Sequence, residues 1–225
     1  MSWGGASVAT TARRRLPRRL AGAGAALVIA VALAGCGATD RAKVSGAQVY
    51  GSYLAIYTSL PLSGPEGERG NSILRGARLA FSQSGGKVGK WTLNFVSLNA
   101  LGGKGRDPDN GQVALNARRA VTDPRSIAYI GDLEKSQTRL SRVIVDQAQL
   151  LQVPPSEGWK AIPGGKSPEP GFQAAYRRQF GERPDDDALF GYEAMSAVLE
   201  AIRRAGPEGS NRIAVADSYR AGPGN

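Results

Sequence analysis

Residues 53–83 read YLAIYTSLPLSGPEGERGNSILRGARLAFSQ, and this stretch decides the fold. Residues 53–62 form an apolar run rich in β-forming side chains, which Pro61 and the turn residues Ser63-Gly64-Pro65 bring to an end. From residue 71 the apolar side chains recur with a helical period, at Ile73, Leu74, Ala77, Ala80 and Phe81. The stretch therefore predicts a strand, a tight turn and an amphipathic helix over 71–83.

The same alternation continues as far as residue 153. We predict strands over 91–98, 126–131 and 150–153 and a helix over 112–121. A further helix is predicted over 138–149 with an apolar face made of Leu140, Val143, Ile144 and Ala148. Strands that alternate with helices of this length favour right-handed crossovers and a parallel sheet. The sequence thus predicts a three-layer, Rossmann-like α/β fold.

In open parallel sheets, ligands bind beyond the carboxyl ends of the strands. The loops predicted at that edge are 59–70, 97–103, 131–136 and 154–158. Residues 159–171 then break the pattern, because they are rich in proline and glycine and have no apolar period. Two further helices are predicted over 172–180 and 187–204, and a weak helix over 212–219.

The N-terminus has the layout of an export signal. Five arginines between residues 13 and 19 precede an apolar run over 21–31, and Leu33-Ala34-Gly35-Cys36 follows. This ending resembles a bacterial lipobox, which implies a signal peptide over 1–35, lipidation of Cys36 and a tether over 36–51. The alternative is a membrane anchor with an incidental cysteine. However, the apolar stretch of 16 residues over 20–35 is shorter than the roughly 20 that a spanning helix needs.

Composition narrows the classes of function. Removal of residues 1–35 would remove five arginines and no acidic residue, so the formal net charge would fall from +10 to +5. The remaining arginine pairs, at 118–119, 177–178 and 203–204, lie on predicted helices with few aromatic residues among them, so we expect solvated faces and no nucleic-acid partner. The chain has no histidine, which excludes Ser-His-Asp catalysis and His-ligated zinc.

Two short motifs have simpler interpretations than the sites they resemble. Gly164-Gly165-Lys166-Ser167 looks like the end of a phosphate-binding loop, but Lys160 stands where that loop needs a glycine. The three adjacent aspartates over 185–187 could attract a cation, but neighbouring side chains do not point the same way. We therefore expect Asp185 or Asp186 to cap the helix that follows, and we expect no metal and no cofactor.

Several segments, taken in order, resemble the first lobe of branched-chain amino-acid-type substrate-binding proteins of ABC transporters. They are LAIYTSLPLSGP (54–65), GARLA (76–80), NARRA (116–120), IAYIGDL (127–133) and LQVPPS (151–156). AYRRQFG (175–181) and GYEAM (191–195) resemble a later part of the same family. The resemblance implies a type I periplasmic binding protein, in which two lobes enclose the ligand.

The resemblance also implies that the second lobe is largely missing here. The domain organisation that follows is a first lobe over 52–158, a linker at the deletion point over 159–171, and late helices over 172–220 that belong to the same lobe. Ligand-binding residues carried over by position are Ser63, Gly64, Lys135, Ser136 and Ser156. Gly158 stands where the family has a threonine, and Arg69 stands near the place of a usual aromatic residue.

The sequence therefore predicts an exported, lipid-anchored solute-binding protein of an ABC importer, at the periplasmic or extracellular face of the membrane. Its expected partners are an ABC permease, the membrane reached through the lipid, and an amino acid or small anion bound weakly by the single lobe. The alternative is a lipid-anchored interaction or sensory module with no role in transport. An enzyme is not expected, because no nucleophile–base pair is evident.

Overall fold

The computed structural model describes residues 47–102, 109–155 and 171–222. All of them belong to one compact unit, Arg41–Asn225. Cys36, Ser156 and nearly all of the predicted linker lie outside the described residues, as does the Gly164–Ser167 motif. Within the described ranges, no helix is long and apolar enough to cross a membrane.

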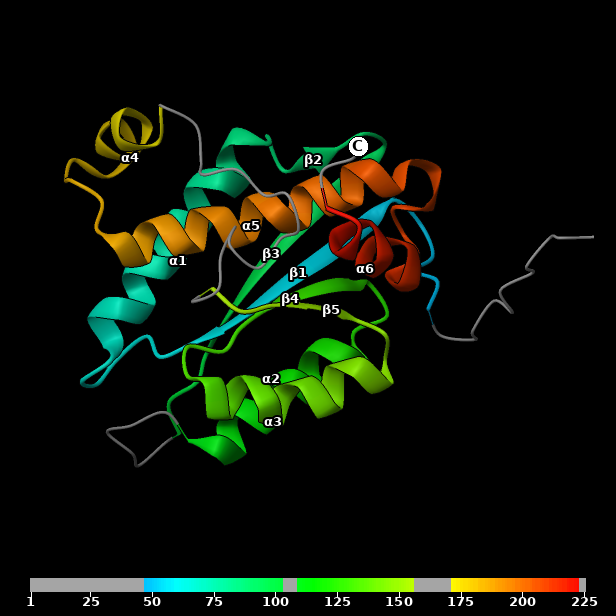
Figure 1. Cartoon of the computed structure of the whole chain (residues 1–225), viewed down its shortest axis with the longest axis horizontal. Helices are drawn as coiled ribbons and strands as arrows, with labels where there is room; N and C mark the ends of the chain where they lie inside the picture. Colours follow the sequence, from blue (N-terminus) through cyan, green and yellow to red (C-terminus); the bar gives the residue numbers. More distant parts are fainter. Residues whose placement is uncertain (1–46, 103–108, 156–170, 223–225) are drawn as a thin grey trace, which may run out of the picture. The chain divides into compact units, whose positions relative to one another are not determined.

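Five strands form one sheet. They are β1 (Tyr53–Leu60), β2 (Lys87–Val88), β3 (Trp91–Asn99), β4 (Ser126–Ile130) and β5 (Leu151–Val153). The order is β2-β3-β1-β4-β5, and every pairing is parallel except that of β2 with β3. An open, mostly parallel sheet with β1 at its centre is Rossmann-like, so the predicted fold class is confirmed (Figure 1).

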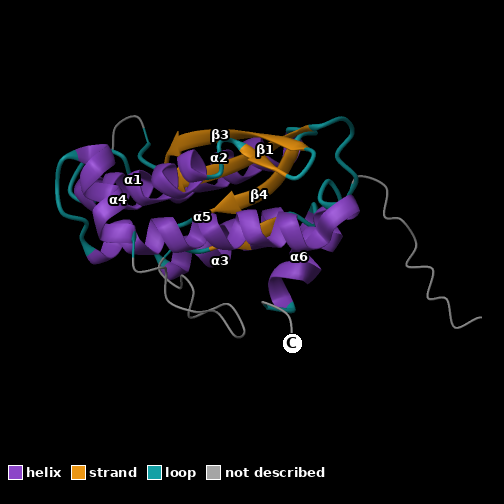
Figure 2. Cartoon of the chain, turned by 90° about the horizontal axis from the view of Figure 1, so that it is seen from above, coloured by secondary structure: helices purple, strands orange, loops and turns teal. Residues whose placement is uncertain are grey.

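Helices cover both faces of this sheet. They are α1 (Gly67–Gln83), α2 (Asn110–Thr122), α3 (Lys135–Gln147), α4 (Phe172–Phe180), α5 (Asp186–Ala205) and α6 (Arg212–Arg220), with a short 3₁₀ turn, η2 (Gly206–Glu208), before α6. α2 and α3 lie on one face, and α1 and α5 lie on the other (Figure 1). Figure 2 shows α6 next to α5 in a second view.

The two-sided cover follows from the sequence of β1, whose side chains are buried on both faces. Leu54 and Ile56 join the core cluster that includes α1, α5 and α6. Ala55 and Tyr57 join the cluster formed with α2 and α3. A continuous apolar run is typical of a parallel strand covered on both sides, because each successive side chain meets a different layer.

The structure corrects the predicted apolar face of the helix over 138–149. Leu140 and Val143 are exposed, by 36% and 63%, and Ile144 and Ala148 are only partly buried. The face that α3 buries is more polar and consists of Gln137, Thr138, Ser141 and Val145. The prediction was wrong because Thr138 and Ser141 are polar side chains that hydrogen-bond to Asp132 below the helix, and hydropathy alone cannot reveal partners.

Smaller differences concern the ends of elements. β1 ends at Leu60 rather than at residue 62, and α1 begins at Gly67, four residues earlier than predicted. The two-residue strand β2 was not predicted; it pairs through Lys87 and Val88 with the start of β3. The expected helix cap is confirmed, since the Asp185 side chain accepts a hydrogen bond from the backbone N–H of Ala188.

α1 and α5 cross at two glycines. A Cβ atom on Gly76 would lie 1.8 Å from the carbonyl oxygen of Ala188, and one on Gly191 would lie 1.9 Å from the carbonyl oxygen of Ile73. The two backbones therefore touch directly, with no room for a side chain between them. This close approach lets Met195 of α5 reach the same core cluster as β1 and β4.

Arg212, at the start of α6, holds the end of the chain against the other layer. Its guanidinium is buried and donates to the carbonyl oxygens of Ser126 (2.8 Å), Asp123 (3.1 Å) and Ala148 (3.4 Å). Asp123 and Ala148 are the C-caps of α2 and α3, where the carbonyl groups carry partial negative charge. One buried cation thus satisfies acceptors at the ends of two helices.

Gly191→Ala tests the crossing of α1 and α5. In a helix interior this change ordinarily stabilises by up to about 1 kcal/mol, because alanine has less backbone entropy to lose on folding. Here we expect the opposite sign, a loss of about 1–3 kcal/mol in the free energy of unfolding, since the new methyl would overlap the Ile73 carbonyl. Urea denaturation measures it. Gly171→Ala is the control, because no atom lies within 4 Å of a Cβ atom there. An increase in stability of Gly191→Ala would show that the helices do not touch.

Candidate functional site

The candidate site lies at the edge of the sheet where the parallel strands end. β1 ends at Leu60, β3 at Asn99, β4 at Ile130 and β5 at Val153. Because parallel strands place their carboxyl ends at one edge, the loops that follow meet there. The sheet order makes β1 and β4 direct neighbours, so the loops after them lie side by side.

The first of these loops contains the predicted residues Ser63 and Gly64. Both are exposed, and Gly64 has a φ of +75°, a conformation that glycine adopts without steric cost. Asn99 joins this loop to the one after β3. Its side-chain oxygen accepts from the backbone N–H groups of Leu62 (3.0 Å) and Leu101 (3.1 Å), and its amide nitrogen donates to the Ser63 hydroxyl (3.4 Å).

Lys135 and Ser136 occupy the first turn of α3, after β4, and both are exposed. The N-cap residue, Glu134, makes no side-chain hydrogen bond to the helix, and the first turn contains no acidic residue. The first N–H groups of a helix have no partner within the helix, so they and a lysine coincide at this end of α3, an arrangement that favours an anion. Ser156, the remaining predicted binding residue, lies outside the described residues.

Arg69, which the sequence analysis placed near the site, is surrounded by carboxylates. Its guanidinium lies 3.1 Å from Glu66, 3.3 Å from Asp187 and 3.8 Å from Glu134. These ion pairs are partly exposed, so solvent and salt weaken them. Arg69 nevertheless links the starts of α1, α3 and α5, and its charge is already balanced, which leaves Lys135 as the cation of the site.

A buried carboxylate, Asp132, organises the loop between β4 and α3. Tyr129 donates a hydroxyl hydrogen bond to Asp132 Oδ1 (3.0 Å), and Ser141 donates one to Oδ2 (2.6 Å). The backbone N–H of Asp132 donates to the Thr138 hydroxyl (3.3 Å), and Gln152 of β5 donates to the Ser141 hydroxyl (2.7 Å). The network fixes residues 131–134 and thereby the position of Lys135 and Ser136.

The environment of Asp132 changes its acidity. The residue is fully buried, and burial raises the pKa of its carboxyl group, although the hydrogen bonds from Ser141 and Tyr129 oppose that rise. The pKa of Tyr129 is also raised, first by burial and then by the neighbouring carboxylate. The sequence analysis included Asp132 in a site loop but missed its role. A carboxylate directly after a buried strand was the available signal.

Asn116 of α2 provides a second connection beneath the site. Its side-chain amide donates to the Ser59 hydroxyl (3.0 Å) and to the carbonyl oxygen of Asn99 (2.9 Å). The residue is buried within a helix face that is otherwise apolar. It ties α2 to the ends of β1 and β3, and no pattern in the sequence pointed to it.

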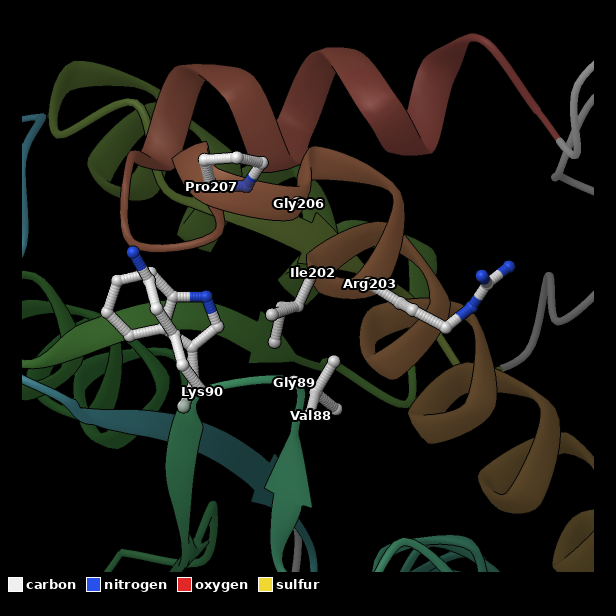
Figure 3. A pocket seen from close by; sticks show the side chains of 8 residues that line it. Val88, Gly89, Lys90, Ile202, Arg203, Gly206 and Pro207 are labelled. Atoms are coloured by element: carbon white, nitrogen blue, oxygen red, sulfur yellow. The ribbon is translucent and has the colours of Figure 1, made fainter.

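Three cavities are lined by described residues, and neither Ser63 nor Lys135 lines any of them. One cavity of about 280 Å³ lies at the start of β3, the opposite end of that strand from Asn99, and is lined by Val88, Gly89, Lys90, Trp91, Ile202, Arg203, Gly206 and Pro207. Val88 and Ile202 point into it, whereas the Arg203 side chain points away (Figure 3) and pairs with Glu200. At the strand ends, the predicted binding residues that the structure describes, Ser63, Gly64, Lys135 and Ser136, are all exposed.

No group of three or more potential metal-ligating side chains occurs in the described part of the chain. The aspartates at 185–187 serve the start of α5, through the N-cap of Asp185 and the ion pair of Asp187 with Arg69. The arrangement offers hydroxyl groups, backbone N–H groups and one lysine, which together can hold a small ligand by hydrogen bonds and charge.

Comparison with solved structures identifies proteins of the same fold. A leucine-binding protein from Thermotoga maritima matches with a TM-score of 0.61 and 14% identity over 74% of this chain and 87% of its own. A branched-chain amino acid transporter substrate-binding protein from Streptococcus pneumoniae, in complex with isoleucine, matches with a TM-score of 0.60 and 10% identity. The match covers 75% of this chain and 88% of its own. A solute-binding protein of an ABC transporter from R. palustris, in complex with benzoate, matches with a TM-score of 0.60 and 11% identity. The match covers 75% of this chain and 86% of its own.

These similarities establish the fold as that of a type I periplasmic binding protein lobe. No family model and no curated protein sequence matches the chain. The neighbours are substrate-binding proteins of ABC transporters, and their ligands range from isoleucine to benzoate.

The pH dependence of stability tests the buried carboxylate. Because the pKa of Asp132 is higher in the folded than in the unfolded chain, the ionised carboxyl destabilises the fold at neutral pH. This destabilisation disappears as the pH falls through the folded-state pKa towards the unfolded value near 4. Asp132→Asn keeps a polar group for both hydroxyl partners. Its free energy of unfolding should therefore exceed that of the wild type most at pH 7 and least at pH 4.

Unfolding by urea at pH 4, 5, 6 and 7 measures this difference. Asp132→Ala is the matched control, since it leaves the hydroxyls of Tyr129 and Ser141 without their Asp132 acceptor. Its free energy of unfolding should fall by about 1–3 kcal/mol for each unsatisfied group. A difference between Asp132→Asn and the wild type that does not change with pH would contradict the assignment.

Proposed function

We propose that the chain is a solute-binding component of an ABC importer. Its proposed ligand is an amino acid or a small anion, and its binding is impaired by the loss of one lobe. One observation carries the proposal. The fold shared with solute-binding proteins brings exposed Ser63 and Gly64 beside the N-terminal turn of α3, with Lys135 and Ser136, at the ends of adjacent strands. Ser156, which follows β5 by three residues, completes the proposed set.

The proposal includes a reduced architecture, with one lobe in place of two. Every strand in the described part of the chain belongs to a single sheet. Residues 156–170, which separate β5 and its following prolines from α4, are too few to form a second lobe. A pocket normally buries 70–90% of a small ligand, and one open surface cannot do so.

Lys135 determines the proposed ligand class. No ion pair of Lys135 is present within the described residues, the adjacent N-cap residue Glu134 pairs with Arg69, and the first N–H groups of a helix have no partner within the helix. A carboxylate or a similar anion fits both. Because the site is open to water, salt screens the attraction, and the affinity should be weak.

A second candidate function is that of an interaction or sensory module without a transport role. The open site favours it, because a surface with one wall suits a protein partner as well as a solute. The absence of histidine and the simple donor set at the site support a binding protein rather than an enzyme.

Isothermal titration calorimetry with leucine, isoleucine, valine and benzoate tests the ligand proposal. We expect dissociation constants of about 1 mM or weaker, equivalent to about −4 kcal/mol, and weaker binding still by Lys135→Gln. Lys87→Gln, an exposed lysine at the start of β2, is the matched control and should not change binding. Micromolar binding would contradict the proposal that one lobe binds the ligand without a second lobe to enclose it. No heat at 20 mM ligand would favour the interaction module.

We further propose that Cys36 is lipidated and anchors the chain at the outer face of the cell membrane. The Leu33-Ala34-Gly35-Cys36 sequence after an arginine-rich and apolar segment supports this. Labelled palmitate should enter the wild-type chain in a bacterial host and should not enter Cys36→Ser. A double variant, Cys36→Ser with Thr39→Cys, keeps one thiol three residues away and should also remain unlabelled. Label in either variant would contradict lipidation at Cys36.

A further inference from the structure

The outer face of α2 and α3 combines positive charge with exposed apolar side chains. Within the two helices the cations are Arg118, Arg119, Lys135, Arg139 and Arg142, and the acidic residue is Asp146. All five cations are exposed. Among the described residues none of the five forms an ion pair. The exposed arginines at 78, 177, 178 and 183 form none either, whereas those at 69, 75, 125, 203 and 220 each do.

Three large apolar side chains share this face with the cations. Leu115 is 57% exposed, Leu140 is 36% exposed and Val143 is 63% exposed. Leu115, Arg118 and Arg119 recur with the helical period on α2. On α3, Arg139, Leu140 and Val143 do the same. We call this surface, made of these three apolar residues and the five cations, the basic face.

The basic face is not required by the fold. α2 and α3 already bury one side against the sheet, through Val113, Ala117, Ala120 and Val145 among others. Lys135 and Arg139 lie four residues apart, as like charges that repel each other slightly. Exposed leucine and valine beside unpaired arginines therefore cost the folded chain a little free energy and satisfy no internal need.

We propose that the basic face docks on a membrane surface that contains anionic lipids. Unpaired cations complement the negative charge of lipid headgroups, and exposed leucine and valine side chains enter the boundary between headgroups and acyl chains. A helical layer with cations and apolar residues side by side has the composition that interfacial binding requires.

The position of the domain favours a membrane over an acidic protein as the partner, and this step rests on the proposed anchor at Cys36. Ten residues lie between Cys36 and Ala47, the first described residue, so this tether of eleven Cα–Cα steps spans at most about 40 Å when fully extended. The anchored domain thus stays at a high effective concentration beside the lipid surface, and weak contacts suffice for docking.

A fluorophore on α3 reports docking directly. The full chain with Cys36→Ser and a single cysteine at Gln147→Cys, an exposed position at the end of α3, is labelled with an environment-sensitive dye and reconstituted into vesicles. We expect the emission of the dye to shift to the blue and to be protected from an aqueous quencher in vesicles with 30% phosphatidylglycerol. In pure phosphatidylcholine we expect neither change. A second chain labelled at Gln173→Cys on α4 should show no shift in either lipid.

Charge variants test the role of the arginines. Each cation near an anionic surface contributes about 1 kcal/mol to binding, which is about a five-fold factor in the docking equilibrium. The double variant Arg139→Gln with Arg142→Gln should therefore lower the ratio of docked to undocked chains about 25-fold. Arg177→Gln with Arg178→Gln, an exposed pair on α4, is the matched control and should leave the ratio unchanged. Salt at 0.5 M should reverse the shift in the wild type, because it screens the cations.

Three outcomes would overturn the proposal. They are equal spectra in anionic and neutral vesicles, an equal shift of the α4 label, and protection by soluble poly-glutamate but not by anionic vesicles, which would indicate an acidic protein partner. Because these chains carry Cys36→Ser, they lack the proposed anchor, so the vesicle lipid is supplied at millimolar concentration to replace the effective concentration that a short tether gives. The result then does not depend on lipidation. A failure of the anchor appears in the palmitate experiment, and a failure of the docking surface appears here.

Discussion

The close crossing of α1 and α5 is the constraint on which the rest of the structure depends. Gly76 and Gly191 allow the two backbones to touch, and no other residue type fits at either position without displacing a carbonyl group. The contact joins a helix that follows the first strand to a helix that begins more than a hundred residues later. It brings Met195 and Ile202 into the core with β1 and β4. Arg212 makes the corresponding connection on the other side of the sheet, because its buried guanidinium reaches the C-caps of α2 and α3.

The candidate site rests on a layer of polar side chains just below the surface. Asp132 and Asn116 are buried and would not meet a ligand themselves, whereas Asn99 is exposed at the end of β3. They hold the loops after β1, β3 and β4 in fixed relative positions through hydrogen bonds to neighbouring side chains and backbone. Ionised Asp132 has no cationic partner in the network, which is why its pKa rises on burial. The described residues thus support the candidate site from below through these hydrogen bonds.

The distribution of charge divides the molecule by function. At the strand ends Arg69 is balanced by three carboxylates and Lys135 is left to attract an anion. On α2 and α3 the arginines have no carboxylate partner and lie beside exposed leucine and valine. Exposed unpaired charge costs a folded protein little free energy, and the cations in both of these places face solvent. The proposed ligand and the proposed lipid surface are both anionic, and each would supply the negative charge that the chain itself lacks there.

The sequence by itself determined the fold class, because apolar periodicity is a local property and each segment of 53–153 has a period that only one element type satisfies. It also indicated the strand-end edge and the cap at Asp185. The tertiary structure alone decided which side of α3 is buried, since Thr138 and Ser141 bond to Asp132 in the loop before the helix and Ser141 also accepts from Gln152 of β5. It alone revealed the network around Asp132 and the contact between Gly76 and Gly191. These features depend on residues distant in the chain, and a local pattern carries no information about which distant groups will meet.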